Sequence, residues 1–130
     1  MRHQDQVSSM QYWQYLRVSC LQGLNRTEEA IALRQQMAEA APWNYFLHTS
    51  LAEILADSGE HQTGIEWLEK QISLGEKWQT SERDQLYSTT ANIMRADHRA
   101  EELLELLGRW IETETTNNYA YVHYLSLIHI

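Results

Sequence analysis

The chain has little of the residues that interrupt or cross-link a fold. Its 130 residues include one proline, five glycines and one cysteine. So few breakers indicate long helices joined by short turns and argue against a sandwich of many short strands. The lone Cys20 excludes an internal disulfide, and we expect it to pack as a small hydrophobic residue.

Long apolar runs are missing too. No stretch approaches the roughly 18 residues needed to span a bilayer, and the polar start, MRHQDQVSSMQ, lacks the apolar core of a signal peptide. We therefore expect a cytoplasmic protein with no membrane partner. At 43% hydrophobic and 22% charged, the composition is that of an ordinary globular protein. The length suits one domain over residues 1–130.

Positive charge is scarce. Ten Lys and Arg residues face 18 Asp and Glu residues, giving a formal net charge of −8 with His neutral. Phosphate binding relies on clustered Lys and Arg side chains, and the basic residues here are scattered, so we expect no nucleic acid partner. The acidic stretches are most simply solvated helix faces, with attraction of a basic partner as the alternative.

Motifs for catalysis are also lacking. The sequence has no glycine-rich phosphate loop, no CxxC pair and no nucleophile elbow. His98 lies near Glu101 and Glu102, and Asp57 with His61 brackets a turn, but solvated surface pairs explain both groups more simply. We expect no catalytic residue, no metal and no cofactor.

What the chain does contain is a repeat. The segment TEEAIALRQQM, residues 27–37, is echoed by HQTGIEWLEKQI, residues 61–72, with Ala30 and Gly64 in register and 34 residues apart. A fixed spacing of this size indicates stacked structural repeats. A looser third copy, YSTTANIMRADHRAEELLELLGRW, places Ala100 36 residues after Gly64.

Apolar spacing within these copies is helical. Ile65, Leu68 and Ile72 recur at i, i+3 and i+7. The same pattern predicts helices over residues 5–24, 27–40, 44–57, 61–74, 81–95, 98–113 and 117–130.

Capping residues mark three of the expected helix starts. Thr27 and Asn44 are expected N-caps, and Ser81 with Asp84 suggests a capping box.

The phrases EEAIALRQQMAEAAPWN and LAEILADSGEHQTGIEWLEKQISLG resemble the tetratricopeptide repeat (TPR) family, whose unit is a helical hairpin of 34 residues. The resemblance covers most of residues 11–112. It implies an all-α, right-handed superhelical array (an α-solenoid) of antiparallel hairpins over about 5–41, 44–75 and 81–113, with an incomplete hairpin at 117–130. Its structural repeat positions fall on Ala30, Pro42, Ala52, Leu55, Gly59, Gly64, Leu68 and Ala100.

Several of these positions carry packing expectations. Small residues at 30, 52, 64 and 100 are expected where two helix backbones come close. Asn25 replaces the turn glycine of the first copy and tolerates a left-handed backbone. Trp13, Trp67 and Trp110 recur at similar places and are expected to fill gaps between helices, with a place in a groove as the alternative.

In TPR arrays the first helices of successive hairpins line a concave groove where partner peptides bind. The resemblance therefore implies a partner-binding groove formed by Tyr12, Tyr15, Ser19, Phe46, Thr49, Glu53, Gln85, Thr89 and Asn92. These positions lack the Lys and Asn set of the TPR domains that clamp a terminal carboxylate. An aromatic, partly acidic groove suits an apolar or basic segment of a protein or peptide partner.

We therefore expect a protein–protein interaction scaffold. Two alternatives stay open: the regulatory or substrate-positioning part of a larger enzyme whose catalytic domain lies outside this chain, and a self-association module that uses the apolar helix at 117–130. The ending SLIHI also resembles the translated read-through of a sequencing adapter, which raises the question whether residues 125–130 are native. The chain is expected to be a truncated fragment of a longer bacterial-type TPR protein.

Overall fold

The computed structural model describes the backbone of residues 2–113 and the side chains of residues 12–113. The predicted helix at 117–130, and the self-association assigned to it, lie outside these residues. The described part is all-helical, as predicted, and contains no strand. Its elements are α1 (Arg2–Gly23), α2 (Thr27–Ala40), α3 (Tyr45–Asp57), α4 (His61–Ile72), the 3-10 turn η1 (Gly75–Lys77), α5 (Thr80–Ala96) and α6 (Ala100–Thr113).

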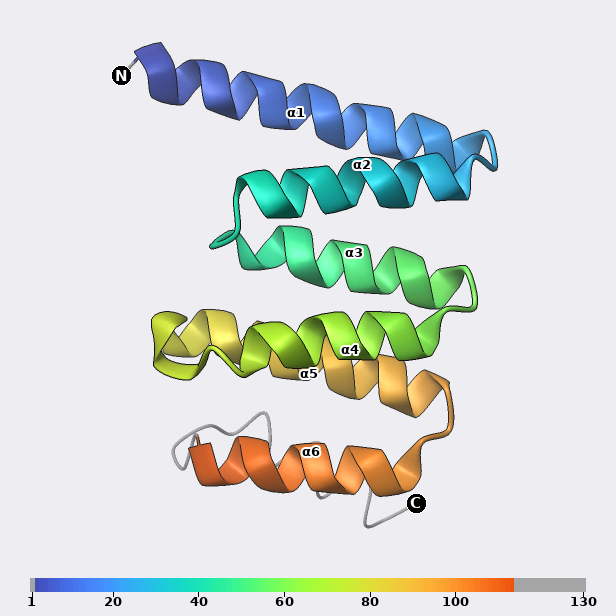
Figure 1. Ribbon diagram of the computed structural model, residues 1–130, viewed down its shortest axis with the longest axis vertical. Helices are drawn as coiled ribbons and strands as arrows, with labels where there is room; N and C mark the ends of the chain where they lie inside the picture. Colours follow the sequence, from blue (N-terminus) through green and yellow to red (C-terminus); the bar gives the residue numbers. More distant parts are fainter. Residues whose placement is uncertain (1, 114–130) are drawn as a thin grey trace.

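Consecutive helices run antiparallel and pack side by side (Figure 1). Contacts join α1 to α2, α3 to α4 and α5 to α6, and further contacts join α2 to α3 and α4 to α5. The first helix of the second pair, α3, also contacts α5 directly. Among the described helices, none is both long and apolar enough to cross a membrane.

The turn inside each helix pair contains one residue with a left-handed backbone. These are Asn25 (φ 59°), Gly59 (φ 91°) and His98 (φ 56°). Asparagine adopts this conformation more readily than most residues, and glycine does so without steric cost, so the expectations for Asn25 and Gly59 are confirmed. His98 holds the same conformation, although the sequence suggested no turn residue there. The three residues serve below as reference points for comparing the pairs.

The close approach expected at Gly64 is confirmed. A Cβ atom built at Gly64 would lie 2.9 Å from the backbone oxygen of Ala52 on α3. Both Ala52 and Ala30 are fully buried. Leu55 and Leu68 are buried as well, as expected of large apolar repeat positions.

The expectation for Ala100 is wrong, because this residue is exposed in the first turn of α6. Gly64 and Ala30 each lie five residues after the left-handed residue of their pair, and the corresponding residue of the third pair is Leu103. The register shifts because the left-handed residues Gly59 and His98 are 39 residues apart, not 34 or 36. Large side chains fill this interface instead, including Leu103 and the stacked rings of Tyr87 and Trp110.

Two expectations about single buried side chains are also wrong. Trp13 is 70% exposed, and Cys20 is exposed. Both lie on α1, which contacts α2 and has no helix on its opposite side in the described part of the chain. Trp67 is partly buried and Trp110 is fully buried, so the gap-filling role applies to those two tryptophans.

The helix starts agree only in part with the predicted caps. Asn44 caps α3, and its side-chain oxygen accepts a hydrogen bond of 3.2 Å from the Phe46 amide. Thr27 is the first residue of α2, whose N-cap residue, Arg26, makes no side-chain capping bond. The capping box of α5 is formed by Gln79 and Glu82 instead of Ser81 and Asp84.

A buried histidine joins α3 to the loop before it and to α4. His48 donates from Nε2 to the backbone oxygen of Pro42 at 2.7 Å and accepts at Nδ1 from the indole N–H of Trp67 at 3.0 Å. Both bonds are satisfied only by the neutral ring with its proton on Nε2. Burial lowers the pKa of His48 below its ordinary value, against a smaller opposing effect of the Pro42 bond.

Candidate functional site

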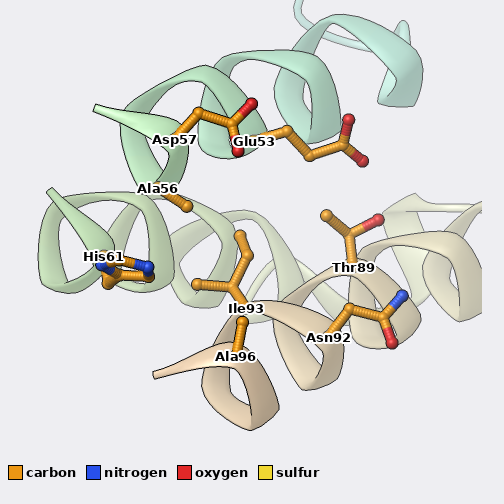
Figure 2. A pocket seen from close by; sticks show the side chains of 8 residues that line it. All are labelled: Glu53, Ala56, Asp57, His61, Thr89, Asn92, Ile93 and Ala96. Atoms are coloured by element: carbon orange, nitrogen blue, oxygen red, sulfur yellow. The ribbon is translucent and has the colours of Figure 1, made fainter. Parts of the chain in front are cut away.

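A hollow of about 340 Å³ opens between α3 and α5. Figure 2 shows its lining, with Glu53 and Asp57 above and the α5 side chains below. The eight lining residues are Glu53, Ala56, Asp57, His61, Thr89, Asn92, Ile93 and Ala96. This volume is at the lower end of the range for small-ligand sites and suits one or two side chains of a partner.

Helix geometry explains why these groups converge. Glu53 and Asp57 are four residues apart on α3 and so lie on one face of that helix. Thr89 and Asn92 are three residues apart on α5, and Figure 2 shows Thr89 pointing toward the Glu53 carboxylate. Because α3 and α5 contact each other, the two polar pairs face across the hollow.

The α3 side of the hollow carries uncompensated negative charge. Neither Glu53 nor Asp57 forms a salt bridge with a Lys or Arg side chain in the described part of the chain. Burial, together with the nearby Asp57 carboxylate, raises the pKa of Glu53 above its ordinary value. Both effects disfavour the charged form, and a cation placed between the two carboxylates would relieve the repulsion.

Arg99, in the turn between α5 and α6, is engaged by other side chains. Arg99 donates from Nε to Asp97 at 2.6 Å, and it also contacts Gln62 and Glu102. The bond from Arg99 lowers the pKa of Asp97. His61 lies 3.7 Å from Asp97, measured from Nδ1 to Oδ1. Arg99 therefore serves the α5–α6 turn and leaves the carboxylates in the hollow unneutralised.

A second feature lies between α1 and α3. The rings of Tyr15 and Phe46 meet edge to face at 5.8 Å, and Phe46 is half exposed. The guanidinium carbon of Arg34, on α2, lies 4.9 Å from the centre of the Tyr15 ring. Nε and Nη1 of Arg34 are buried and have no hydrogen-bond partner among the residues that the structure describes, and burial lowers the pKa of Arg34. Arg34 lies nine residues after Asn25, the left-handed residue of the first pair. In the second and third pairs the corresponding positions hold Leu68 and Leu107.

The structure places five of the nine residues predicted for the groove in two separate features. Glu53, Thr89 and Asn92 line the same hollow, and Tyr15 contacts Phe46. Tyr12, Ser19 and Gln85 are exposed.

Thr49 does not belong to this surface. It is buried, and its hydroxyl donates to the Phe46 carbonyl at 3.1 Å. The prediction for Thr49 is therefore wrong, because its side chain is satisfied by its own helix and has no exposed face for a partner.

Three titratable side chains at these two features, Asp57, His61 and Arg34, were not predicted for the groove. Asp57 could have been found from its position one helical turn after Glu53. His61 comes from the start of α4, and its place depends on how α4 packs beside α3. Arg34 lies on a second helix, so a rule that considers only first helices misses it. In the part of the chain that the structure describes, no group of three or more His, Cys, Asp or Glu side chains could hold a metal ion.

No protein-family model matches this chain, and no curated protein matches it significantly.

Proposed function

We propose that this chain is a TPR-like scaffold that binds a basic and apolar segment of a partner protein along the surface formed by α1, α3 and α5. The observation that carries the proposal is the hollow between α3 and α5, where two carboxylates lie beside hydroxyl and amide groups and form no salt bridge with a described Lys or Arg side chain. The repeat of 34 residues and the antiparallel helix pairs support the array.

The chemistry of the hollow selects a cation. A Lys or Arg side chain entering it would meet Glu53 and Asp57 on one side and Thr89 and Asn92 on the other. Ile93, Ala56 and the aliphatic stem of the entering residue can pack together, because long basic side chains bury their carbon atoms beside apolar surface. A hydrogen bond that involves a charged group is worth about 1.5–3 kcal/mol, or about ten- to a hundredfold in affinity.

The aromatic pair provides the apolar part of the surface. Tyr15 and Phe46 lie on α1 and α3, and α3 also contributes Glu53 and Asp57 to the hollow. Exposed aromatic rings on rigid helices are common anchors in interfaces. A partner segment with an apolar residue and a basic residue in extended or helical conformation would engage both features.

A peptide library tests the proposal. Short synthetic peptides would carry Lys, Glu or Leu at each position in turn, and fluorescence anisotropy would measure their binding. Wild type is expected to select peptides with Lys near an apolar residue. The double variant Glu53→Gln, Asp57→Asn is expected to bind them at least tenfold more weakly. Preference for acidic peptides, or no binding by any library member, would refute the proposal.

Two controls separate site from bulk charge. The variant Glu101→Gln, Glu105→Gln removes the same net charge from exposed positions of α6 and should bind as wild type does. The variant Tyr15→Ala, Phe46→Ala should weaken binding of the apolar residue without changing the preference for Lys. Equal loss in the α6 control would show that attraction is non-specific.

A further inference from the structure

The outer surface of α1 carries large apolar side chains that are exposed. Trp13 is 70% exposed and Leu16 is 42% exposed. Cys20, one turn further along, is exposed as well. We refer to Trp13, Leu16 and Cys20 together as the α1 face.

Equivalent residues in the second helix pair are buried. Trp13 lies twelve residues before Asn25, as Leu47 does before Gly59. Cys20 corresponds in the same way to Ile54, five residues before Gly59. Leu47 and Ile54 are buried in one apolar cluster with residues of α2, the second helix of the preceding pair.

The third pair repeats this relation. Leu86 and Ile93 hold the corresponding places on α5, and both are buried in a cluster with Ile65 and Leu68 of α4. In two separate instances, therefore, the second helix of one pair covers this face on the first helix of the next. Trp13 and Cys20 hold the same register on α1 but lack such a neighbour in the described part of the chain.

The chain carries a matching surface at its other described end. Leu104 on α6 is 44% exposed, and Ile111 is partly exposed. Leu104 lies six residues after His98, the left-handed residue of its pair. Ile31 on α2 and Ile65 on α4 lie six residues after the left-handed residues of the first and second pairs. Ile31 packs against the cluster that contains Leu47 and Ile54 of α3, and Ile65 is buried in the cluster that contains Leu86 and Ile93 of α5.

Charge favours the same pairing. The part of α1 whose side chains the structure describes carries one arginine, Arg17, and no acidic residue, whereas α6 contains four glutamates and one arginine. Two copies of α1 placed against each other would bring like charges together. Contact between α1 and α6 places a net positive helix against a net negative one.

We propose that α6 of one copy packs on the α1 face of a second copy, so that the helix pairs continue from molecule to molecule. The contact is heterologous, because different surfaces meet, and it leaves one free surface at each end of the assembly. The chain therefore associates head to tail into short linear oligomers that lengthen with concentration. Excess negative charge, −8 per chain, opposes this growth.

Two blocked variants test the contact. The first variant, Trp13→Glu with Leu16→Glu, disrupts only the α1 face. The second, Leu104→Glu, disrupts only the exposed surface of α6. Sedimentation velocity should show wild-type oligomers whose mass rises with concentration, while each blocked variant alone is monomeric. An equimolar mixture of the two should form a dimer with one copy of each, since one intact surface of each kind remains.

The alternatives give different results. Self-association of Leu104→Glu would indicate contact between two α1 helices and would overturn the proposal. A wild type that stays monomeric at all concentrations would also overturn it. Leu74→Glu replaces an exposed leucine outside both surfaces and should associate as wild type does. Circular dichroism checks that each variant is folded, which is expected because the substituted residues are exposed.

The single cysteine reports which face is covered. Cys20 is the only thiol in the chain, and mass spectrometry distinguishes the two variants in the mixture. Alkylation of Cys20 should slow severalfold in Leu104→Glu, whose α1 face is occupied, and should stay unchanged in the partner variant. Equal rates in both chains of a mixture that does dimerise would place the contact elsewhere.

Discussion

Replacing Gly64 with alanine forces a methyl group against the backbone of the neighbouring helix. The added Cβ atom would lie 2.9 Å from the carbonyl oxygen of Ala52, well inside the 3.4–4 Å of ordinary contact. No rotation of a side chain relieves this contact, because Ala52 contributes backbone atoms. The helices α3 and α4 must therefore separate by several tenths of an ångström.

Two effects of opposite sign decide the result. Extra atoms in a close-packed interior cost about 1–3 kcal/mol. Alanine gains about 1 kcal/mol over glycine inside a helix. The net expectation for Gly64→Ala is a free energy of unfolding lowered by about 1 kcal/mol, which lowers the melting temperature by about 3–5 °C for a chain of this size.

A matched substitution isolates the packing effect. Gly108 is also helical, and a Cβ atom there meets nothing within 4 Å. Gly108→Ala should therefore raise the free energy of unfolding by up to about 1 kcal/mol, the gain in helix propensity alone. Urea and thermal unfolding at low protein concentration measure both variants. A Gly64→Ala variant stabilised as much as Gly108→Ala would refute the close approach of α3 and α4, and Gly64→Leu should destabilise far more than either.

Two further predictions concern buried polar side chains. Arg34→Leu is expected to raise the free energy of unfolding by about 1 kcal/mol. It removes a guanidinium whose Nε and Nη1 atoms lack partners and puts leucine at the position that Leu68 and Leu107 hold in the later pairs. Urea unfolding measures this change, and a less stable variant would contradict the prediction. Because the pKa of His48 is lowered in the folded chain, the unfolded chain binds a proton there more readily. The contribution of His48 to the free energy of unfolding is therefore fully present above the unfolded pKa of about 6.5 and is lost as the pH falls through the folded pKa. Urea unfolding between pH 7 and pH 5 should show this loss, and His48→Gln should flatten the profile; an equal slope in both proteins would exclude His48.

Local signals in the chain were enough to place the helices. Apolar spacing and the scarcity of breakers predicted α2 and α3 almost to the residue, because helix periodicity and turn residues act over a few positions. The resemblance to the TPR family placed Glu53, Thr89 and Asn92 on one surface, and these three residues line one hollow.

Local signals did not predict the length of the connection between the second and third helix pairs. The longer link through η1 shifts the register, which leaves Ala100 exposed and places Leu103 in the interface. The residues around Ala100 do not distinguish it from Ala30. The difference arises from the number of residues in the connection through η1 between the second and third helix pairs. His98 was likewise assigned to a helix and is the left-handed turn residue.

The sequence by itself determined the all-helical class, most helix boundaries and the acidic character of the chain, because these depend on residue type and short-range spacing. Only the tertiary structure decided which side chains meet across helices. It joins Glu53 and Asp57 to Thr89 and Asn92, buries Thr49 and leaves Trp13 exposed. Those outcomes depend on whether a neighbouring helix covers a given face, and the period of a repeat cannot supply that information for the first helix.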